Sequence, residues 1–265
     1  MSCERYIFSV IKATAVTLIC IFVILAVLGY LIMWLPRLPG PYHGVYLTHG
    51  VLGNIYEGLS IYDEEHGRLP AAVAVDPKSG EPASWRIKIY QWAFKSLNDN
   101  QFFDYDNNKA WNDKKNLKLA HDGAWLFRTT NDLRGRNLGK AGIFATYYKA
   151  ITGPDTAFDP PTRLSLDQLP NDLILVVRVD YSDTHWMEPV DLSVEELMPS
   201  DKTKRLLLGK DGYGVLFADG EGWVLSDETP IEYLRGFFTI SGAEKFNREQ
   251  LLGPYRVIPD EQTGK

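Results

Sequence analysis

Four side chains that commonly bind metal ions occur close together in one stretch of the chain. They are Asp180, Asp183, His185 and Glu188. Imidazole and carboxylate groups are suitable ligands for zinc and iron, so this stretch could serve a metal-dependent hydrolase. The spacing matches no metalloenzyme signature, and the block HWMEPVDLS equally suits packing by Trp186 and a local hydrogen bond from His185. We keep the hydrolase as an alternative and expect neither a metal nor a cofactor.

A second group of oxygen ligands resembles the start of a calcium loop. Asp104, Asp106 and Asn108 stand at alternating positions, as the first ligands of such a loop do. However, Lys109 replaces the glycine that the turn requires, and Lys115 stands where a bidentate glutamate belongs. We therefore expect a polar surface turn, with an irregular calcium site as the alternative.

The sequence offers few groups for covalent catalysis. It contains no G-x-S-x-G elbow, and both of its cysteines, Cys3 and Cys20, precede residue 21. Glu195 and Glu196 could act as a catalytic carboxylate pair, but the dipole of a helix that begins beside them explains them equally well. We expect that the protein is not an enzyme.

Aromatic residues are concentrated between Trp85 and Trp111. Rings of this kind form either a hydrophobic core or an exposed face that binds carbohydrate or protein. We expect core packing as the default, and name Trp92, Trp111 and Trp186 as a possible recognition surface.

The elements that hold these residues begin with an uncharged, apolar run from Ala13 to Pro36. This run is long enough to cross a hydrocarbon core of about 30 Å as a helix. Arg5 and Lys12 precede it and only Arg37 follows closely, which favours an N-terminus inside the cell. We predict an uncleaved, single-pass anchor in the inner (cytoplasmic) membrane, with the following domain extracytoplasmic and membrane lipid as a partner.

The rest of the chain divides into a short stalk and one domain. Residues 37–41 are rich in proline and disfavour helix. We therefore assign 1–36 to the N-terminal tail and transmembrane helix, 37–41 to the stalk, 42–253 to the domain and 254–265 to a C-terminal tail. The chain has formal net charge −6, and because residues 1–36 contribute +1, the remainder carries −7. Nucleic acid is therefore excluded as a partner.

Hydrophobic periodicity predicts the main elements of the domain. A helical face is formed by residues spaced three and four apart, ending near Gly67: Val51, Leu52, Ile55, Leu59 and Tyr62. Strands are predicted over 71–76, 144–150 and 173–179, the last apolar enough to be central.

Turn and capping signals predict the C-terminal half of the domain. Strands 215–218 and 223–225 flank Asp219 and Gly220, which should form the turn of an antiparallel hairpin. Capping boxes that start at Ser193 and Thr229 predict two short helices, the second with Pro230 at its first position and running to Phe238. The fold class is α+β, with an amphipathic helix packed on an antiparallel sheet.

Several blocks together carry a resemblance to a known family. They are HGRLPAAVAVDPKSGEPASWRI, AWND, TYYKAITGPDTAFD, HWMEPVDLS and GVLFADGEGWVLSDETPIEYLR, in that order between His49 and Phe246. In this order they resemble the bacterial domain of unknown function (DUF) 1559 family, which is prepilin-like or pseudopilin-like. The family's His-x9-Asp-Gly signature is degenerate here, because Gly209 stands ten residues before Asp219. The prepilin cleavage motif is also absent from MSCERYIFSVIK.

The resemblance implies a membrane helix that leads into a pseudopilin-like extracytoplasmic domain. It implies a non-enzymatic role in interaction or assembly, as a homo-oligomer or with proteins of a secretion or pilus-like apparatus. The alternative is a membrane-tethered binding module for polysaccharide or peptide.

Overall fold

The computed structural model describes residues 43–75, 80, 82–95, 105–129, 132, 140–158 and 164–258. The chain divides into two units, 1–41 and 42–265, and all the described residues belong to the second. The predicted span from Ala13 to Pro36 and the stalk lie outside the described residues. None of the helices in the described ranges combines the length and the apolar character needed to cross a membrane.

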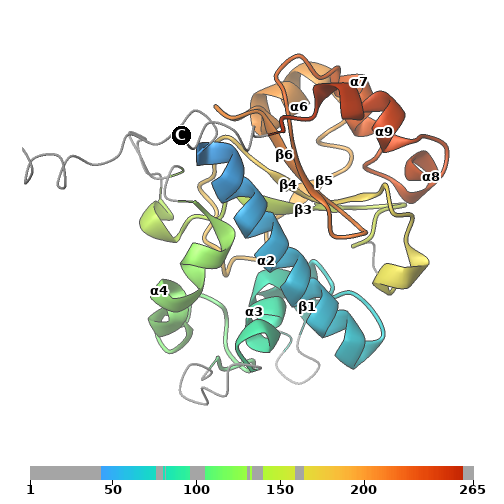
Figure 1. Cartoon of the computed structure of the whole chain (residues 1–265). Helices are drawn as coiled ribbons and strands as arrows, with labels where there is room; N and C mark the ends of the chain where they lie inside the picture. Colours follow the sequence, from blue (N-terminus) through green and yellow to red (C-terminus); the bar gives the residue numbers. More distant parts are fainter. Residues whose placement is uncertain are drawn as a thin grey trace, which may run out of the picture. The chain divides into compact units, whose positions relative to one another are not determined.

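The first described element is the long helix α2, His43–His66, which crosses the front of the domain in Figure 1. It buries the predicted face, and Leu52, Ile55 and Leu59 are fully buried. The helix ends as predicted, because Gly67 has a φ of 63° and donates its N–H to the Asp63 carbonyl at 2.7 Å. The helix begins earlier than the predicted face, and Val45 and Thr48 extend its buried side.

The main sheet has five strands in the order β5-β3-β4-β6-β7. Their bounds are β3 Tyr148–Thr152, β4 Ile174–Arg178, β5 Leu192–Ser193, β6 Tyr213–Phe217 and β7 Gly222–Leu225. The pairs are antiparallel except for β3 with β5, which run parallel, so the sheet is mixed and not purely antiparallel as predicted. The strand predicted over 173–179 is indeed central and fully buried.

A smaller sheet pairs β1, Val73–Val75, with β2, Pro82–Ser84. Helix α3, Trp85–Lys95, follows β2 directly and packs against α2. The strand predicted over 71–76 therefore forms, over a shorter range. The strand predicted over 144–150 begins only at Tyr148, because Gly142–Phe144 form a 3-10 turn, η3. The described domain is α+β, as expected.

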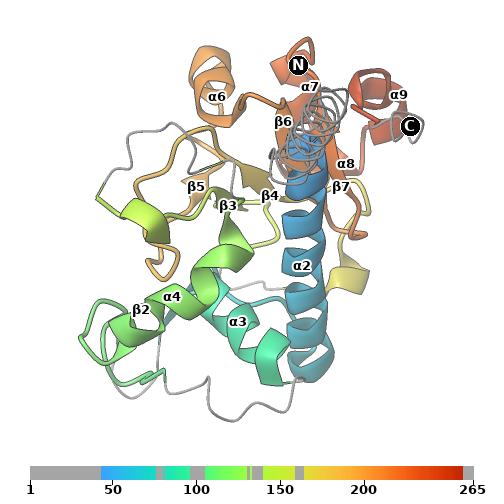
Figure 2. The same ribbon diagram turned by 60° about the vertical axis from the view of Figure 1, so that its left-hand side comes forward.

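The remaining helices are short. They are η1 Asn116–Leu119, α4 Ala120–Gly123, η2 Ala124–Phe127, η4 Leu166–Gln168, α6 Ser200–Leu207, α7 Ile231–Arg235, α8 Ile240–Ala243, α9 Arg248–Leu251 and η5 Gly253–Tyr255. Figure 2 shows α6, α7 and α9 at one end of the domain and α3 at the other.

The two predicted capping boxes have different outcomes. Ser193 and Glu196 exchange the hydrogen bonds of a capping box, but residues 194–197 form only a turn, and the next helix, α6, begins at Ser200. Thr229 does not cap α7, because its hydroxyl donates to the Ser226 carbonyl at 2.7 Å. Pro230 is the N-cap and not the first helical residue, and α7 ends at Arg235 instead of Phe238.

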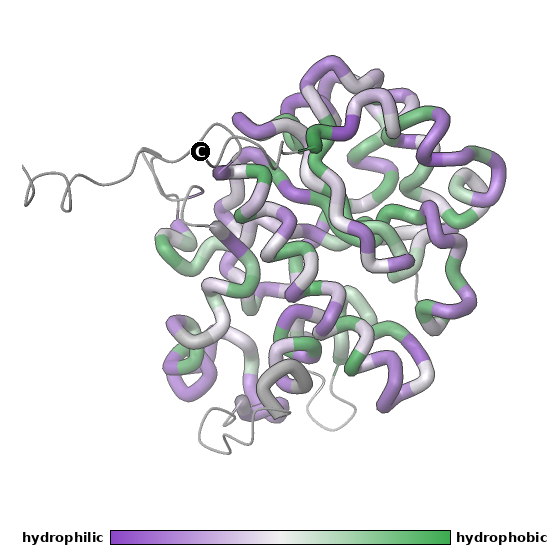
Figure 3. The backbone as a smooth tube through the Cα atoms, in the orientation of Figure 1, coloured by the Kyte–Doolittle hydropathy of each residue, from purple (hydrophilic) through white to green (hydrophobic). Residues whose placement is uncertain are grey.

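Helix α2 lies against β6 and β7 because glycines there leave room for it. A Cβ at Gly222 would lie 2.9 Å from the Cβ of Leu52, and one at Gly214 would lie 2.9 Å from a methyl of Thr48. In Figure 3 hydrophobic and hydrophilic residues alternate along α2, which agrees with a helix that buries one face. These contacts place the core between α2 and the sheet.

The domain continues beyond Gly253, so the segment predicted as a tail from residue 254 is part of it. Val257 donates its N–H to the Val224 carbonyl at 2.8 Å, and Ser226 donates to the Tyr255 carbonyl at 2.8 Å. This stretch therefore follows the outer edge of β7 and covers main-chain groups that would otherwise lack partners.

Candidate functional site

A buried carboxylate, Asp191, organises the polar groups beneath the edge of the main sheet. It forms an ion pair with Arg86, in which both side chains are buried (0% and 2% exposed). Its oxygens also accept the Trp85 indole N–H at 3.1 Å and the Ala150 backbone N–H at 2.8 Å. Arg86 in turn donates to the Tyr148 carbonyl and the Ser84 hydroxyl. These partners neutralise or hydrogen-bond both buried charges, which gives this cluster a structural character.

Lys149 lies beside this ion pair and is itself buried. Its amine donates to the Thr184 hydroxyl at 2.6 Å and to the Val190 carbonyl at 2.9 Å. Burial, helped by the positive charge of Arg86, lowers the pKa of Lys149 to about 7, and the carboxylates of Asp191 and Glu188 oppose that shift. Close to neutral pH the amine is therefore partly uncharged.

A cleft of about 470 Å³ opens above the cluster, within the range of volumes usual for ligand sites. Its lining combines small and apolar residues with a single carboxylate: Ala72, Val73, Thr152, Gly153, Phe158, Pro189, Val190 and Asp191. Two of the lining residues, Val73 and Val190, are 45% and 46% exposed. Asp191 is already paired with Arg86. The surface that the cleft offers to a ligand is therefore mainly apolar.

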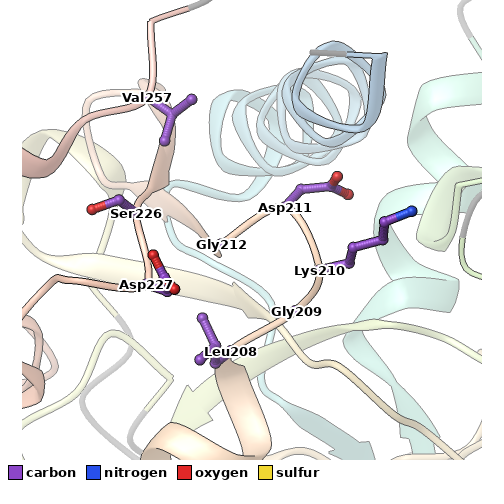
Figure 4. Close-up of a pocket in the computed structure, with 8 residues that line it drawn as sticks. All are labelled: Leu208, Gly209, Lys210, Asp211, Gly212, Ser226, Asp227 and Val257. Carbon is purple, nitrogen blue, oxygen red and sulfur yellow. The ribbon is translucent and has the colours of Figure 1, made fainter. Parts of the chain in front are cut away.

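A second hollow, of about 300 Å³, lies at the start of α2 (Figure 4). It is formed by the turn 208–212 together with Ser226, Asp227 and Val257. Gly209 and Gly212 close the turn by exchanging two backbone hydrogen bonds. Figure 4 shows Asp211 pointing toward α2, where a Cβ on Gly44 would overlap its carboxylate. A negative charge at this helix end is favourable, so Asp211 stabilises the start of α2.

The four residues of the predicted zinc or iron site do not converge. No group of three or more histidine, cysteine, aspartate or glutamate side chains among the described residues is placed to hold a metal ion. Asp183 instead accepts the Ala141 N–H at 3.1 Å, and Glu188 accepts the His185 N–H at 3.3 Å. Asp183 and Glu188 thus serve separate local contacts, and Glu188 reaches the backbone of His185 rather than its ring.

His185 packs among aromatic rings in place of binding metal. Its ring lies 5.2 Å from Trp111 and 5.5 Å from Phe144, between centroids. Nδ1 accepts the Met187 N–H at 3.2 Å, so the ring proton is on Nε2. Burial lowers the pKa of His185 to about 4, and the imidazole is therefore neutral at pH 7.

The residues considered for calcium form an ordinary polar turn where they are described. Asp106 accepts the Asn108 backbone N–H at 3.1 Å and lies 3.5 Å from the Lys115 amine. The hydrogen bond from Asn108 is the main reason that the pKa of Asp106 is lowered. Asp104 lies outside the described residues.

The three tryptophans of the predicted recognition surface have different environments. Trp186 is only 1% exposed and donates its indole N–H to the Ala120 carbonyl, so it belongs to the core and not to a surface. Gly123 makes room for it, since a Cβ there would lie 2.4 Å from the ring. Trp111 is partly buried and packs against the core. The side chain of Trp92 lies outside the described residues.

Asp219 and Gly220 form the turn between β6 and β7. Gly220 has a φ of 91° and donates its N–H to the Phe217 carbonyl at 3.1 Å. Asp219 accepts the Glu221 N–H at 3.0 Å and also binds Arg248. Arg248 belongs to another element, α9, and no local sequence signal indicates that it pairs with Asp219.

Comparison with known proteins adds no relative to this description. The chain matches no family model, no curated protein and no solved structure at a significant level. The site is therefore interpreted from its own geometry.

The sequence did not predict the cluster of Arg86, Lys149 and Asp191, nor the cleft above it. Arg86 and Asp191 are 105 residues apart, and only the tertiary fold brings them together. The one local sign was the presence of Arg86 between Trp85 and Ile87 in the largely apolar helix start WRIKIYQW.

Proposed function

We propose that this chain is a membrane-anchored, non-enzymatic protein whose domain is pseudopilin-like and acts by binding other proteins. On this proposal it belongs to a secretion or pilus-like apparatus, and the domain is extracytoplasmic. The observation that carries the proposal is the position of α2. This helix of 24 residues is the first described element after the predicted stalk, and it packs along α3, β6 and β7.

The chain length between anchor and domain supports this arrangement. Helix α2 begins seven residues after Pro36, which ends the apolar run. Seven residues span at most about 25 Å when fully extended. On this proposal, the chain that joins the apolar run to the domain is therefore short.

A second candidate is a tethered binding module that never assembles into a filament. The cleft lined by Val73 and Val190 favours it, because exposed apolar side chains beside a hollow are typical of binding sites. The burial of Trp186 removes one of the rings on which a polysaccharide surface would depend. Peptide is thus the better-supported ligand.

The anchoring and the orientation can be tested by cysteine labelling. In a background with Cys3→Ser and Cys20→Ser, Tyr181→Cys places one thiol at a position that is 54% exposed. We expect a membrane-impermeant maleimide to label it in intact spheroplasts and the protein to sediment with membranes. The matched control retains Cys3 alone and should be labelled only after lysis. Labelling of position 181 only after lysis, or recovery in the soluble fraction, would contradict the proposal.

A further inference from the structure

Strand β1 has one edge that β2 does not use. Trp85 donates its N–H to the Ala72 carbonyl at 3.2 Å, which makes these two residues a hydrogen-bonded pair of the ladder. Hydrogen-bonded and non-bonded pairs alternate in an antiparallel ladder. The register pairs Ala74 with Ala83, and Val75 with Pro82. Ala74 therefore points its main-chain groups toward β2, whereas those of Val73 and Val75 point away.

The residue opposite Val75 agrees with this alternation. Pro82 has no N–H, and a proline is tolerated where the ladder requires no donor. Across the described ranges, no backbone hydrogen bond outside the β1–β2 ladder involves Val73 or Val75. Their side chains are also 45% and 58% exposed. An open strand edge with β-branched, exposed residues is a template for another strand.

This open edge borders the cleft. Val73 lines it together with Gly153 and Val190. An extended segment added beside β1 would form hydrogen bonds with Val73 and Val75 and place alternate side chains toward the cleft. Peptide recognition by strand addition combines these two features.

The charges around the cleft indicate which charge an added strand should carry. Val194 lies beside Gly153, 3.4 Å from where a Cβ would stand, and the exposed residues Glu195 and Glu196 follow it. Residues 37–265 as a whole carry a formal charge of −7. Lys202 lies 3.6 Å from Glu196 and offsets one of these two charges, and the remaining negative charge attracts a basic segment. A second copy of the domain would bring like charges together.

We infer that the cleft binds an extended segment of a partner protein as a third strand on β1. The segment has apolar β-branched residues at alternate positions and a basic residue near Glu195 and Glu196. This inference rests on the proposed function only in requiring a protein partner, and it specifies the chemistry of that partner.

Amide hydrogen exchange measured by NMR tests the inference on the full chain in detergent micelles. The probe is the peptide acetyl-Lys-Val-Thr-Val-Thr-Val-amide at millimolar concentration. We expect the amides of Val73 and Val75 to exchange rapidly in the free protein and at least about tenfold more slowly with the peptide. Ala74 is the internal control, because its N–H already points toward β2. The same peptide with alternate backbone nitrogens methylated should give no protection.

A pair of variants separates strand addition from general apolar contact. Val75→Pro removes an outward N–H without touching the pairing with Pro82, and should weaken peptide binding about tenfold, the equivalent of one hydrogen bond. Val75→Thr keeps both the shape and the N–H, and should bind like the parent. Equal affinities for the two variants would overturn the inference.

Three other results would also overturn it. Unchanged exchange with peptide present means that no strand is added. Protection of Val73 and Val75 in the free protein means that the chain itself covers the edge, or a second copy if the protection depends on concentration. None of these results affects cysteine labelling at position 181, so the anchoring proposal is tested independently of this inference.

Discussion

Arg248 and Asp219 form a two-point ion pair that joins α9 to the turn between β6 and β7. One nitrogen of the guanidinium lies 2.9 Å from an Asp219 oxygen, and a second nitrogen binds the other oxygen. The guanidinium also lies over the Phe217 ring, 4.6 Å from its centroid. Planar contacts of this kind require arginine, because a lysine amine can neither bind two oxygens in parallel nor stack.

The first prediction concerns this ion pair. Arg248→Lys should lower the free energy of unfolding by about 1–3 kcal/mol, because Asp219 loses a two-point partner in a partly buried site. Thermal or urea unfolding measures the effect. Glu244→Lys, on the exposed surface, is the control and should change stability little. Equal stabilities of Arg248→Lys and the parent would show that the pair contributes nothing.

The same pair predicts a loss of stability in acid. Burial alone would raise the pKa of Asp219, but the hydrogen bonds and charge of Arg248 more than offset it, and the pKa is lowered. A lowered carboxyl pKa stabilises the fold above the pKa of the unfolded chain, and that contribution disappears as pH falls through the folded value. Between pH 6 and pH 3 the parent should therefore lose more stability than Asp219→Asn. Parallel pH curves would contradict this.

The second turn residue, Gly220, should not tolerate a side chain. Its φ of 91° is unfavourable for other residues, and a Cβ would lie 2.6 Å from the Tyr56 ring. Gly220→Val should lower the melting temperature clearly, by the equivalent of about 2 kcal/mol or more. Gly50→Ala in α2 is the opposite control, because nothing lies within 4 Å and alanine favours helix. An unchanged melting temperature for Gly220→Val would refute the turn assignment.

The buried pair of Arg86 and Asp191 should show strong coupling. Arg86→Met leaves a buried carboxylate without its cation and should cost about 3–5 kcal/mol. Adding Asp191→Asn removes the stranded charge and should recover part of that loss. A double-mutant cycle from urea unfolding gives the coupling energy. Additive effects would mean that the two charges do not interact.

The lowered pKa of Lys149 predicts that the free energy of unfolding increases with pH. Its pKa is about 7 in the folded protein, whereas an unfolded lysine titrates near 10.4. Between these values the unfolded chain binds more protons, so the free energy of unfolding rises with pH, by about 1 kcal/mol per unit. Lys149→Met should reduce the slope measured between pH 7.5 and 9. Identical slopes would show that Lys149 is charged in the folded state.

Local patterns predicted the elements that depend on neighbours in sequence. The buried face of α2, the central strand β4 and the β6–β7 hairpin follow from periodicity and turn residues within short windows. The predictions of helices after Ser193 and Thr229 were less accurate. The side chains that fit a cap also fit a simple turn, and Thr229 hydrogen-bonds backward to Ser226.

The candidate site could not be predicted, because its parts come together only in three dimensions. Val73 and Val190 are far apart in sequence and line the same cleft. Trp186 was included in a possible recognition surface, with core packing as the default. Gly123 provides the space that buries it, and nothing near Trp186 in sequence indicates that glycine. Closeness in sequence also made Asp183 and His185 candidates for one metal site, as an alternative, whereas their side chains serve separate contacts.

The most direct test of the central claim, that the protein is anchored in a membrane and acts through other proteins, is cross-linking within the membrane. Val23→Cys, with Cys3→Ser and Cys20→Ser, provides a single thiol in the apolar run. After cross-linking in native membranes, mass spectrometry identifies the products. The account predicts homo-oligomers or conjugates with secretion components. A full-length monomer as the only product would contradict it.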